Sequence, residues 1–171
     1  MYTFYNGDIY DGAWHDGLMH GCGLYSYPDG SEFFGRFEHG RKVNGKYKYA
    51  NGDVFSGEFE NGLKSSGQMK YDDGREFNGD FENGMRKCGT MEFPNGDIYN
   101  GEYDNVGLMS GGGVMQYMNG DTFSGDFVEG LMHGAGKMIF NNSAVYIGEF
   151  KHDLLHGDGE YTFPNGSIYN G

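Results

Sequence analysis

Residues 7–30 read GDIYDGAWHDGLMHGCGLYSYPDG, and variants of this stretch recur along the whole chain. Each variant has a glycine at the place of Gly12, and these closing glycines are 22 to 24 residues apart. They are Gly12, Gly35, Gly57, Gly79, Gly101, Gly125, Gly148 and Gly171. A fixed period of this length indicates a repeat architecture. We therefore predict one array over residues 1–171, with about seven full repeats and a partial repeat at each end.

Each repeat is predicted to form a β-hairpin. In the first repeat, side chains alternate over residues 8–14 and again over 21–27, which is the period of a β-strand. Residues 15–20 are predicted to form the loop between these strands. Pro28-Asp29-Gly30 is predicted to make a tight turn into the next repeat, and most other repeats have an Asn-Gly or Asp-Gly pair there. The fold class is therefore all-β.

The aromatic side chains follow the same period as the glycines. Of the 29 aromatic residues, 27 lie in register: two positions before or after a closing glycine, or at the end of the second strand. Glycine weakens a strand, but a ring from a neighbouring strand can cover its bare backbone and restore the contact. We therefore predict a single-layer antiparallel sheet that buries much of its own apolar surface.

We call the aromatic residues that line this sheet the aromatic stripe. The stripe is also our candidate groove for a partner protein, because aromatic residues are common at binding hot spots. Trp14 is the single tryptophan and the best candidate for an anchor. For most of the stripe, packing of rings over glycines is the alternative role. The candidate residues are Tyr10, Trp14, Tyr25, Phe33, Phe37, Tyr47, Phe55, Phe59, Phe77, Phe81, Tyr99, Tyr103, Phe123, Phe127, Tyr146 and Phe150.

Composition and charge narrow the classes of partner. The chain has a net charge of −13, which argues against nucleic acid and anionic lipid as partners. The charge is −5 over residues 1–35, +1 over 36–87 and −9 over 88–171. The acidic ends are solvated surface or, alternatively, sites for basic partners. No apolar run has the length of a membrane span and no signal peptide is evident, so we expect a cytoplasmic protein. Cys22 and Cys88 are expected to be free thiols.

The stretch from Tyr10 to Gly23, YDGAWHDGLMHGCG, resembles the MORN repeat (membrane occupation and recognition nexus). Three repeats keep the family's His-Gly-x-Gly pattern, at 20–23, 133–136 and 156–159. Three others are one residue shorter there, and another gains a residue near Val106. The resemblance implies an elongated, single-layer antiparallel β-solenoid of repeated β-hairpins. It also implies a scaffold along whose aromatic groove a partner segment lies.

No motif for catalysis or cofactor binding is present. The glycines at 111–113 and 134–136 belong to the repeat and do not form a phosphate-binding loop. His133, His152 and His156 could meet and bind zinc, but no Cys or acidic cluster completes such a site, so we expect them to be hairpin-loop residues. We predict no catalytic residue, no metal and no cofactor, and therefore no enzyme in this chain.

These observations favour a structural scaffold or adaptor that binds proteins. The family resemblance suggests a cytoskeletal or ciliary assembly, axonemal or similar to a radial spoke, with end-to-end or lateral self-association as an option. One alternative is a membrane or phosphoinositide module. Its patch would lie within residues 36–87 and include Arg41, Lys42, Lys46, Lys48, Arg86 and Lys87. Another alternative is an accessory array of an enzyme whose catalytic domain lies outside this chain.

Overall fold

A computed structural model describes residues 1–171, and all of its regular elements are β-strands. The chain divides into two compact units, Met1–Met85 and Arg86–Gly171. The first contains β1 (Tyr2–Thr3), β2 (Ile9–His15), β3 (Leu18–Ser26), β4 (Glu32–Glu38), β5 (Arg41–Lys48), β6 (Val54–Glu60), β7 (Leu63–Lys70) and β8 (Glu76–Glu82). The second contains β9 (Met85–Glu92) from Arg86 onward, β10 (Ile98–Tyr103), β11 (Met109–Gln116), β12 (Thr122–Val128), β13 (Leu131–Ile139), β14 (Val145–Lys151), β15 (Leu154–Thr162) and β16 (Ile168–Asn170).

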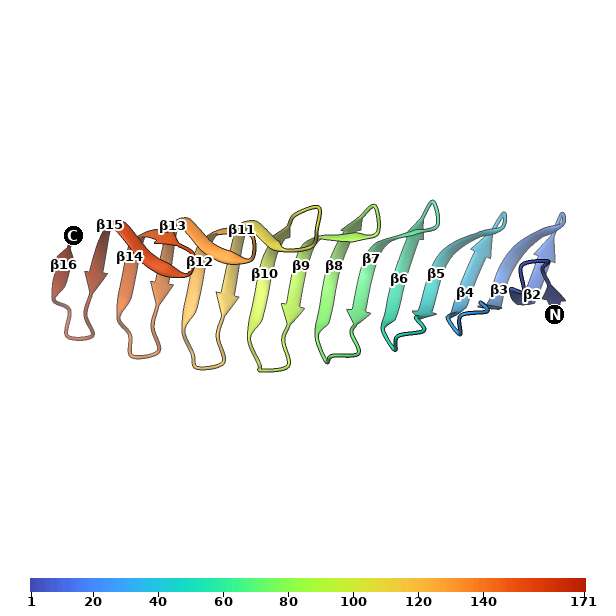
Figure 1. Ribbon diagram of the computed structural model, residues 1–171, viewed down its shortest axis with the longest axis horizontal. Helices are drawn as coiled ribbons and strands as arrows, with labels where there is room; N and C mark the ends of the chain where they lie inside the picture. Colours follow the sequence, from blue (N-terminus) through green and yellow to red (C-terminus); the bar gives the residue numbers. More distant parts are fainter. The chain divides into compact units, whose positions relative to one another are not determined.

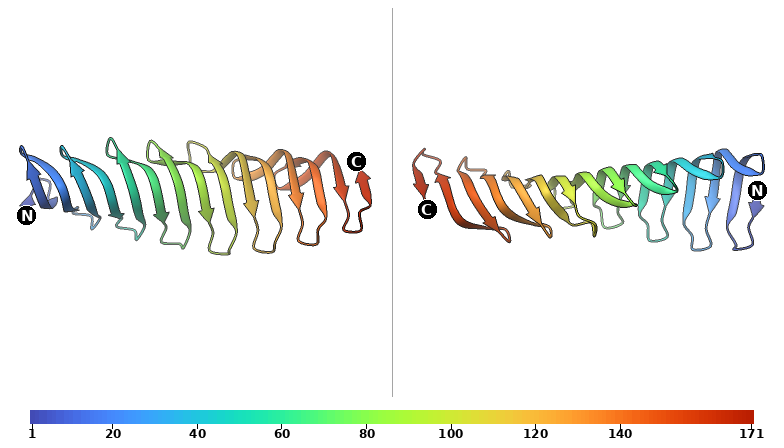
Figure 2. Two further views of the ribbon diagram at one scale, coloured as in Figure 1. Left: turned by 180° about the vertical axis from the view of Figure 1, so that it is seen from behind. Right: turned by 90° about the horizontal axis from the view of Figure 1, so that it is seen from above.

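Each unit is a single-layer antiparallel sheet whose strands pair in chain order. In the first unit β1 pairs with β2, and the pattern continues to β7 and β8. In the second, it runs from β9 and β10 to β15 and β16. No helix or second sheet packs on either unit (Figures 1 and 2). The predicted all-β, single-layer fold of antiparallel hairpins is confirmed. No helix with the length and apolar character of a membrane span is present.

Glycines form a row across each sheet. Gly12 pairs with Gly23, and Gly23 pairs in turn with Gly35. In the second unit, Gly101 pairs with both Gly89 and Gly113. The ring of Tyr10 explains the first pair: a Cβ on Gly23 would lie 2.5 Å from its Cε2 atom and 2.6 Å from its hydroxyl oxygen. A side chain cannot share this space, so the ring and the two glycines form one packing unit.

The core of each sheet is a ladder of edge-to-face rings. The ring two positions before a closing glycine contacts a ring of its own repeat and one of the next. Tyr10 is 5.3 Å from Trp14 and 5.1 Å from Phe37, at interplanar angles of 85° and 77°. In the second unit, Tyr99 is 5.4 Å from Tyr103 and 5.0 Å from Phe127. Aromatic pairs in this geometry each contribute roughly 0.5–1.5 kcal/mol beyond the area that they bury. The predicted packing of rings over glycines is thus confirmed.

One of the two predicted connections differs in the structure. The loop predicted at 15–20 is wrong, because β2 continues to His15 and β3 already begins at Leu18. Asp16 and Gly17 form a two-residue turn with φ of 50° and 74°, the left-handed backbone of the hairpin turns that match strand twist. The tight turn predicted at 28–30 is confirmed, because the Gly30 N–H donates to the Tyr27 carbonyl at 3.1 Å, and the Tyr27 N–H donates to the Ser31 carbonyl to close the loop around it. An Asp-Gly pair occurs both at 16–17 and at 29–30, so this residue pair alone could not show which of the two connections is the two-residue turn.

A β-bulge explains why the repeats differ in length. In the His-Gly-x-Gly repeats, two extra residues stand on the second strand between two successive register pairs. Gly125 pairs with Gly136 and Asp126 with His133, so Gly134 and Ala135 are extra. The shorter repeats hold one extra residue, because Arg36 pairs with Asn44 and Phe37 with Lys42. A bulge bends a strand and increases its twist, so the fold tolerates either length.

Candidate partner-binding face

Most of the predicted groove residues are buried in the core. Of the sixteen candidates, eleven are buried: Tyr10, Phe33, Phe37, Phe55, Phe77, Phe81, Tyr99, Phe123, Phe127, Tyr146 and Phe150. Tyr25, Tyr47, Phe59 and Tyr103 are half-buried, and Trp14 is 42% exposed. The buried rings are covered by rings of adjacent repeats, which the sequence could not reveal. Partner binding by the stripe stays a prediction, and direct contact is open chiefly to the five less buried residues.

A row of four tyrosines on β3, β5 and their ends lies in the first unit. We call Tyr25, Tyr27, Tyr47 and Tyr49 the tyrosine row. Successive ring centroids are 4.8, 5.7 and 4.4 Å apart. All four side chains are half-buried. Tyr27 and Tyr49 were missed as candidate site residues, although the sequence has a Tyr-x-Tyr pattern at both places.

Three members of the tyrosine row, Tyr25, Tyr27 and Tyr49, have raised pKa values. Burial raises the pKa of Tyr25 to about 12, and a hydrogen bond from its hydroxyl to Asp8 Oδ2, at 2.5 Å, adds to this. Burial likewise raises the pKa of Tyr49 to about 12 and that of Tyr27 well above its ordinary value. These three hydroxyl groups therefore stay protonated at neutral pH, and the Tyr25 hydroxyl donates its hydrogen bond to Asp8.

One strand position differs systematically between repeats. It is the cross-strand partner of the aromatic residue two positions after the closing glycine. In the first unit, Met19, Lys42 and Lys64 occupy this position opposite Trp14, Phe37 and Phe59. In the second unit, Met109, Met132 and Leu155 occupy it. Methionine and leucine complete the apolar layer, whereas the lysines bring a charge to the same place.

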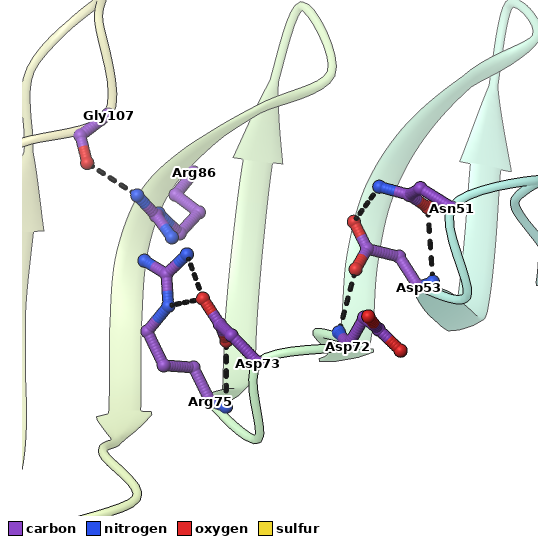
Figure 3. A network of polar contacts seen from close by, with 7 residues as sticks. All are labelled: Asn51, Asp53, Asp72, Asp73, Arg75, Arg86 and Gly107. Atoms are coloured by element: carbon purple, nitrogen blue, oxygen red, sulfur yellow. Dashed lines mark hydrogen bonds and ion pairs between the residues drawn. The ribbon is translucent and has the colours of Figure 1, made fainter.

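The lysines at this position are folded against rings. The Lys42 Nζ atom is 4.5 Å from the ring centroid of Tyr47 and 5.1 Å from those of Tyr27 and Phe33. Lys64 Nζ is 5.0 Å from the centroid of Phe81. Arg86, in the second unit, lies 5.0 Å from the ring of Tyr103 and donates to the Gly107 carbonyl at 2.6 Å (Figure 3). Lys42 and Arg86, predicted as part of a lipid patch, are thus engaged with aromatic rings.

Acidic side chains in the longer loops brace one repeat against the next. Asp53 Oδ2 accepts a hydrogen bond from Asn51 Nδ2 at 3.0 Å, and the Asp53 N–H donates to Asn51 Oδ1 at 3.1 Å. Its other oxygen, Oδ1, accepts the Asp72 N–H of the following loop at 2.8 Å (Figure 3). In the second unit, Asp121 Oδ1 accepts the Asn141 N–H in the same way, also at 2.8 Å. These carboxylates therefore have a structural role.

The histidines and cysteines form no evident metal centre. The rings of His133 and His152 lie 5.6 Å apart, as their spacing allowed, whereas His156 pairs in register with Glu149. No group of three or more His, Cys, Asp or Glu side chains is arranged to hold a metal ion. Neither Cys22 nor Cys88 forms a disulfide.

The family model of the MORN repeat matches residues 10–32, 33–54, 55–74, 123–145 and 146–168, more than half of the chain. The chain belongs to the MORN-repeat family. MORN repeats thus account for both units, and residues 75–122, outside these matches, keep the same hairpin pattern and glycine pairs. A search of curated protein sequences gives no significant match.

Solved structures give a match of fold. The TCP domain of Drosophila melanogaster SAS-4 (dCPAP), in complex with a proline-rich motif of Ana2 (dSTIL), is 15% identical. The match covers 88% of this chain and 83% of that one, with a TM-score of 0.57, which indicates a shared fold. The TCP10 domain of Danio rerio CPAP is 14% identical over 99% of this chain and 92% of that one, with a TM-score of 0.30. Its complex with a STIL peptide is 17% identical over 96% and 93%, with a TM-score of 0.27.

Proposed function

We propose that this MORN array is a non-catalytic scaffold that binds extended segments of partner proteins on its aromatic face. The observation that carries the proposal is the tyrosine row, whose four half-buried rings follow one another on an uncovered single-layer sheet. Rings in a row offer flat apolar contacts, and a hydroxyl group at the end of the row, that of Tyr49, can donate to a carbonyl of an extended backbone.

A proline-rich segment is the occupant that we favour. Aromatic-lined surfaces recognise such segments because the polyproline II conformation is already extended and loses little entropy on binding. The SAS-4 TCP domain, which shares the fold, was solved with a proline-rich motif. That ligand belongs to the other protein, and for this chain it supports the proposal by analogy of fold alone.

The setting that we propose is the cytoskeleton, in the cytoplasm, within a centriolar, ciliary or axonemal assembly. The family resemblance to scaffolds of cytoskeletal and ciliary assemblies favours this setting over a membrane. A net charge of −13 opposes binding to an anionic bilayer. Self-association of the array, end to end or side by side, belongs to the same proposal and predicts a concentration-dependent oligomeric state.

The test is affinity purification of the tagged protein with cross-linking and mass spectrometry. Wild type is compared with Tyr27→Ala/Tyr49→Ala and with a control, Tyr117→Ala, at the same strand position in the second unit. Loss of cytoskeletal partners in the double variant alone, with cross-links near the tyrosine row, supports the proposal. Recovery of membrane proteins and a lipid kinase in place of cytoskeletal partners contradicts it.

A further inference from the structure

A cleft in the first unit places two basic side chains beside the tyrosine row. Its lining includes Met19, Tyr25, Tyr27, Phe37, Arg41, Lys42 and Asn61. Lys42 Nζ donates a hydrogen bond to the Tyr27 hydroxyl at 2.5 Å. Arg41 Nη1 donates to Asn61 Oδ1 at 3.3 Å. Apolar side chains and two cations therefore line the same hollow, which we call the Lys42 cleft.

Neither cation in the Lys42 cleft is paired with a carboxylate. Other basic side chains of this acidic unit do form ion pairs: Arg36 with Glu38, Lys70 with Glu76 at 2.8 Å, and Arg75 with Asp73 at 2.8 Å. Glu38, which faces Arg41 across the strands, is the partner of Arg36. Asp8 accepts from the Tyr25 hydroxyl and from Asn6, and it forms no ion pair with Lys42. The cleft thus holds two positive charges without a carboxylate in contact with either.

The charge of Lys42 is not required by the fold. The same strand position is Met19, Met109, Met132 or Leu155 in other repeats, where an apolar side chain completes the layer. Burial lowers the pKa of Lys42 to about 8, although the charge of Asp8 partly offsets the effect. The surrounding rings attract the ammonium group, but they do not replace the hydration of a charge as a carboxylate does. A half-buried lysine among rings therefore gains from an anionic ligand.

We propose that the Lys42 cleft binds a single Asp or Glu side chain of the partner segment, with an apolar residue of that segment beside it. The proposal rests on the proposed function and specifies the partner. The amine is recessed among rings, so a carboxylate on a flexible aliphatic stem can reach it more easily than a bulky phosphorylated headgroup. Met19 and Phe37 provide the apolar walls for the neighbouring side chain. An otherwise neutral segment avoids repulsion by the net charge of −13.

The experiment uses a display library of proline-rich segments in which the central residues vary over all amino acids. Selection on the full chain is expected to enrich Asp or Glu at one central position. The best peptide is then compared with its Gln or Asn counterpart by fluorescence polarisation. We expect the acidic peptide to bind at least about tenfold more tightly, as for a charge-assisted hydrogen bond.

Two variants test the assignment. Lys42→Met introduces the residue that other repeats hold at this position, so the fold is preserved. In this variant the ratio of the affinities for the acidic peptide and its amide counterpart should fall close to one. Lys64→Met is the matched control one repeat further on, and it should keep the preference because Lys64 does not line the cleft. Unchanged far-ultraviolet circular dichroism in both variants checks the fold.

Three results would overturn the inference. Equal affinity for both peptides, with loss of binding in Tyr27→Ala/Tyr49→Ala, removes the carboxylate site but leaves the proposed function intact. If Lys42→Met still prefers the acidic peptide, the carboxylate binds at another place on the chain and not in the Lys42 cleft. If the library yields no binder while vesicles containing phosphoinositides bind the wild type and not Lys42→Met, both the inference and the proposed function fail.

Discussion

A methyl group at Gly23 should collide with the buried ring of Tyr10. The Cβ of Gly23→Ala would lie 2.5 to 2.7 Å from three atoms of this ring, closer than side chains pack. Tyr10 is fully buried and held between Trp14 and Phe37, so the ring cannot move without losing edge-to-face contacts. Overpacking costs about 1–3 kcal/mol and each lost ring contact roughly 0.5–1.5 kcal/mol. We expect the free energy of unfolding to fall by about 3 kcal/mol.

The assay is urea unfolding followed by circular dichroism and by the fluorescence of Trp14, which lies 5.3 Å from Tyr10. A double-mutant cycle with Tyr10→Ala isolates the collision. Because the shortened side chain removes the ring, the Gly23→Ala substitution should cost about 2 kcal/mol less in that background. Gly112→Ala is the control, since its Cβ would meet no atom within 4 Å, and its effect should stay within about 0.5 kcal/mol.

Two outcomes would refute this reasoning. The first is an equal cost of Gly23→Ala with and without the Tyr10 ring, which would show that the ring does not exclude the methyl group. The second is an equal cost at Gly112, which pairs with Asp126 outside the glycine row, and it would mean that replacing a strand glycine is unfavourable whatever its new side chain meets. Either result would remove the physical explanation of the glycine–aromatic pairing.

Four further outcomes are expected. Lys42 has a lowered pKa of about 8 in the folded state, so between pH 8 and pH 10 the unfolded chain binds more protons and the free energy of unfolding should rise with pH. Urea unfolding over this pH range should show the rise in the wild type and not in Lys42→Met. The raised pKa values of Tyr25 and Tyr49, about 12, should make stability fall above pH 10, with phenol ionisation at 295 nm delayed until unfolding. Asp53→Ala removes the acceptor of the Asp72 N–H, and urea unfolding should show that the free energy of unfolding falls by about 1 kcal/mol. His39→Asn should raise the free energy of unfolding by about 0.5 kcal/mol, because His39 has a left-handed φ of 48° and asparagine already occupies this turn position at Asn61 and Asn83. An unchanged melting temperature would argue against turn strain at His39.

The repeat, the all-β class and the pairing of glycines with rings could all be predicted from the amino-acid sequence. These features depend on local periodicity, since alternation within a strand places Tyr10, Gly12 and Trp14 on one face. The 22- to 24-residue period then brings equivalent residues of successive hairpins into neighbouring positions. The extra residue near Val106 lies in the longer loop from Asp104 to Leu108 that joins β10 and β11.

Contacts between successive hairpins, which the sequence does not reveal, separate the core rings from the surface rings. Tyr10 is covered because Phe37 of the next hairpin reaches it, and this contact joins residues far apart in the chain. The turn at Asp16 and Gly17 also depended on the register of the whole hairpin, since Asp-Gly pairs lie at both of its ends. From the sequence, Lys42 was only one basic residue of a possible lipid-binding patch. Its place among four rings follows from cross-strand pairing with Phe37 and from the neighbouring repeats, which a linear pattern does not encode.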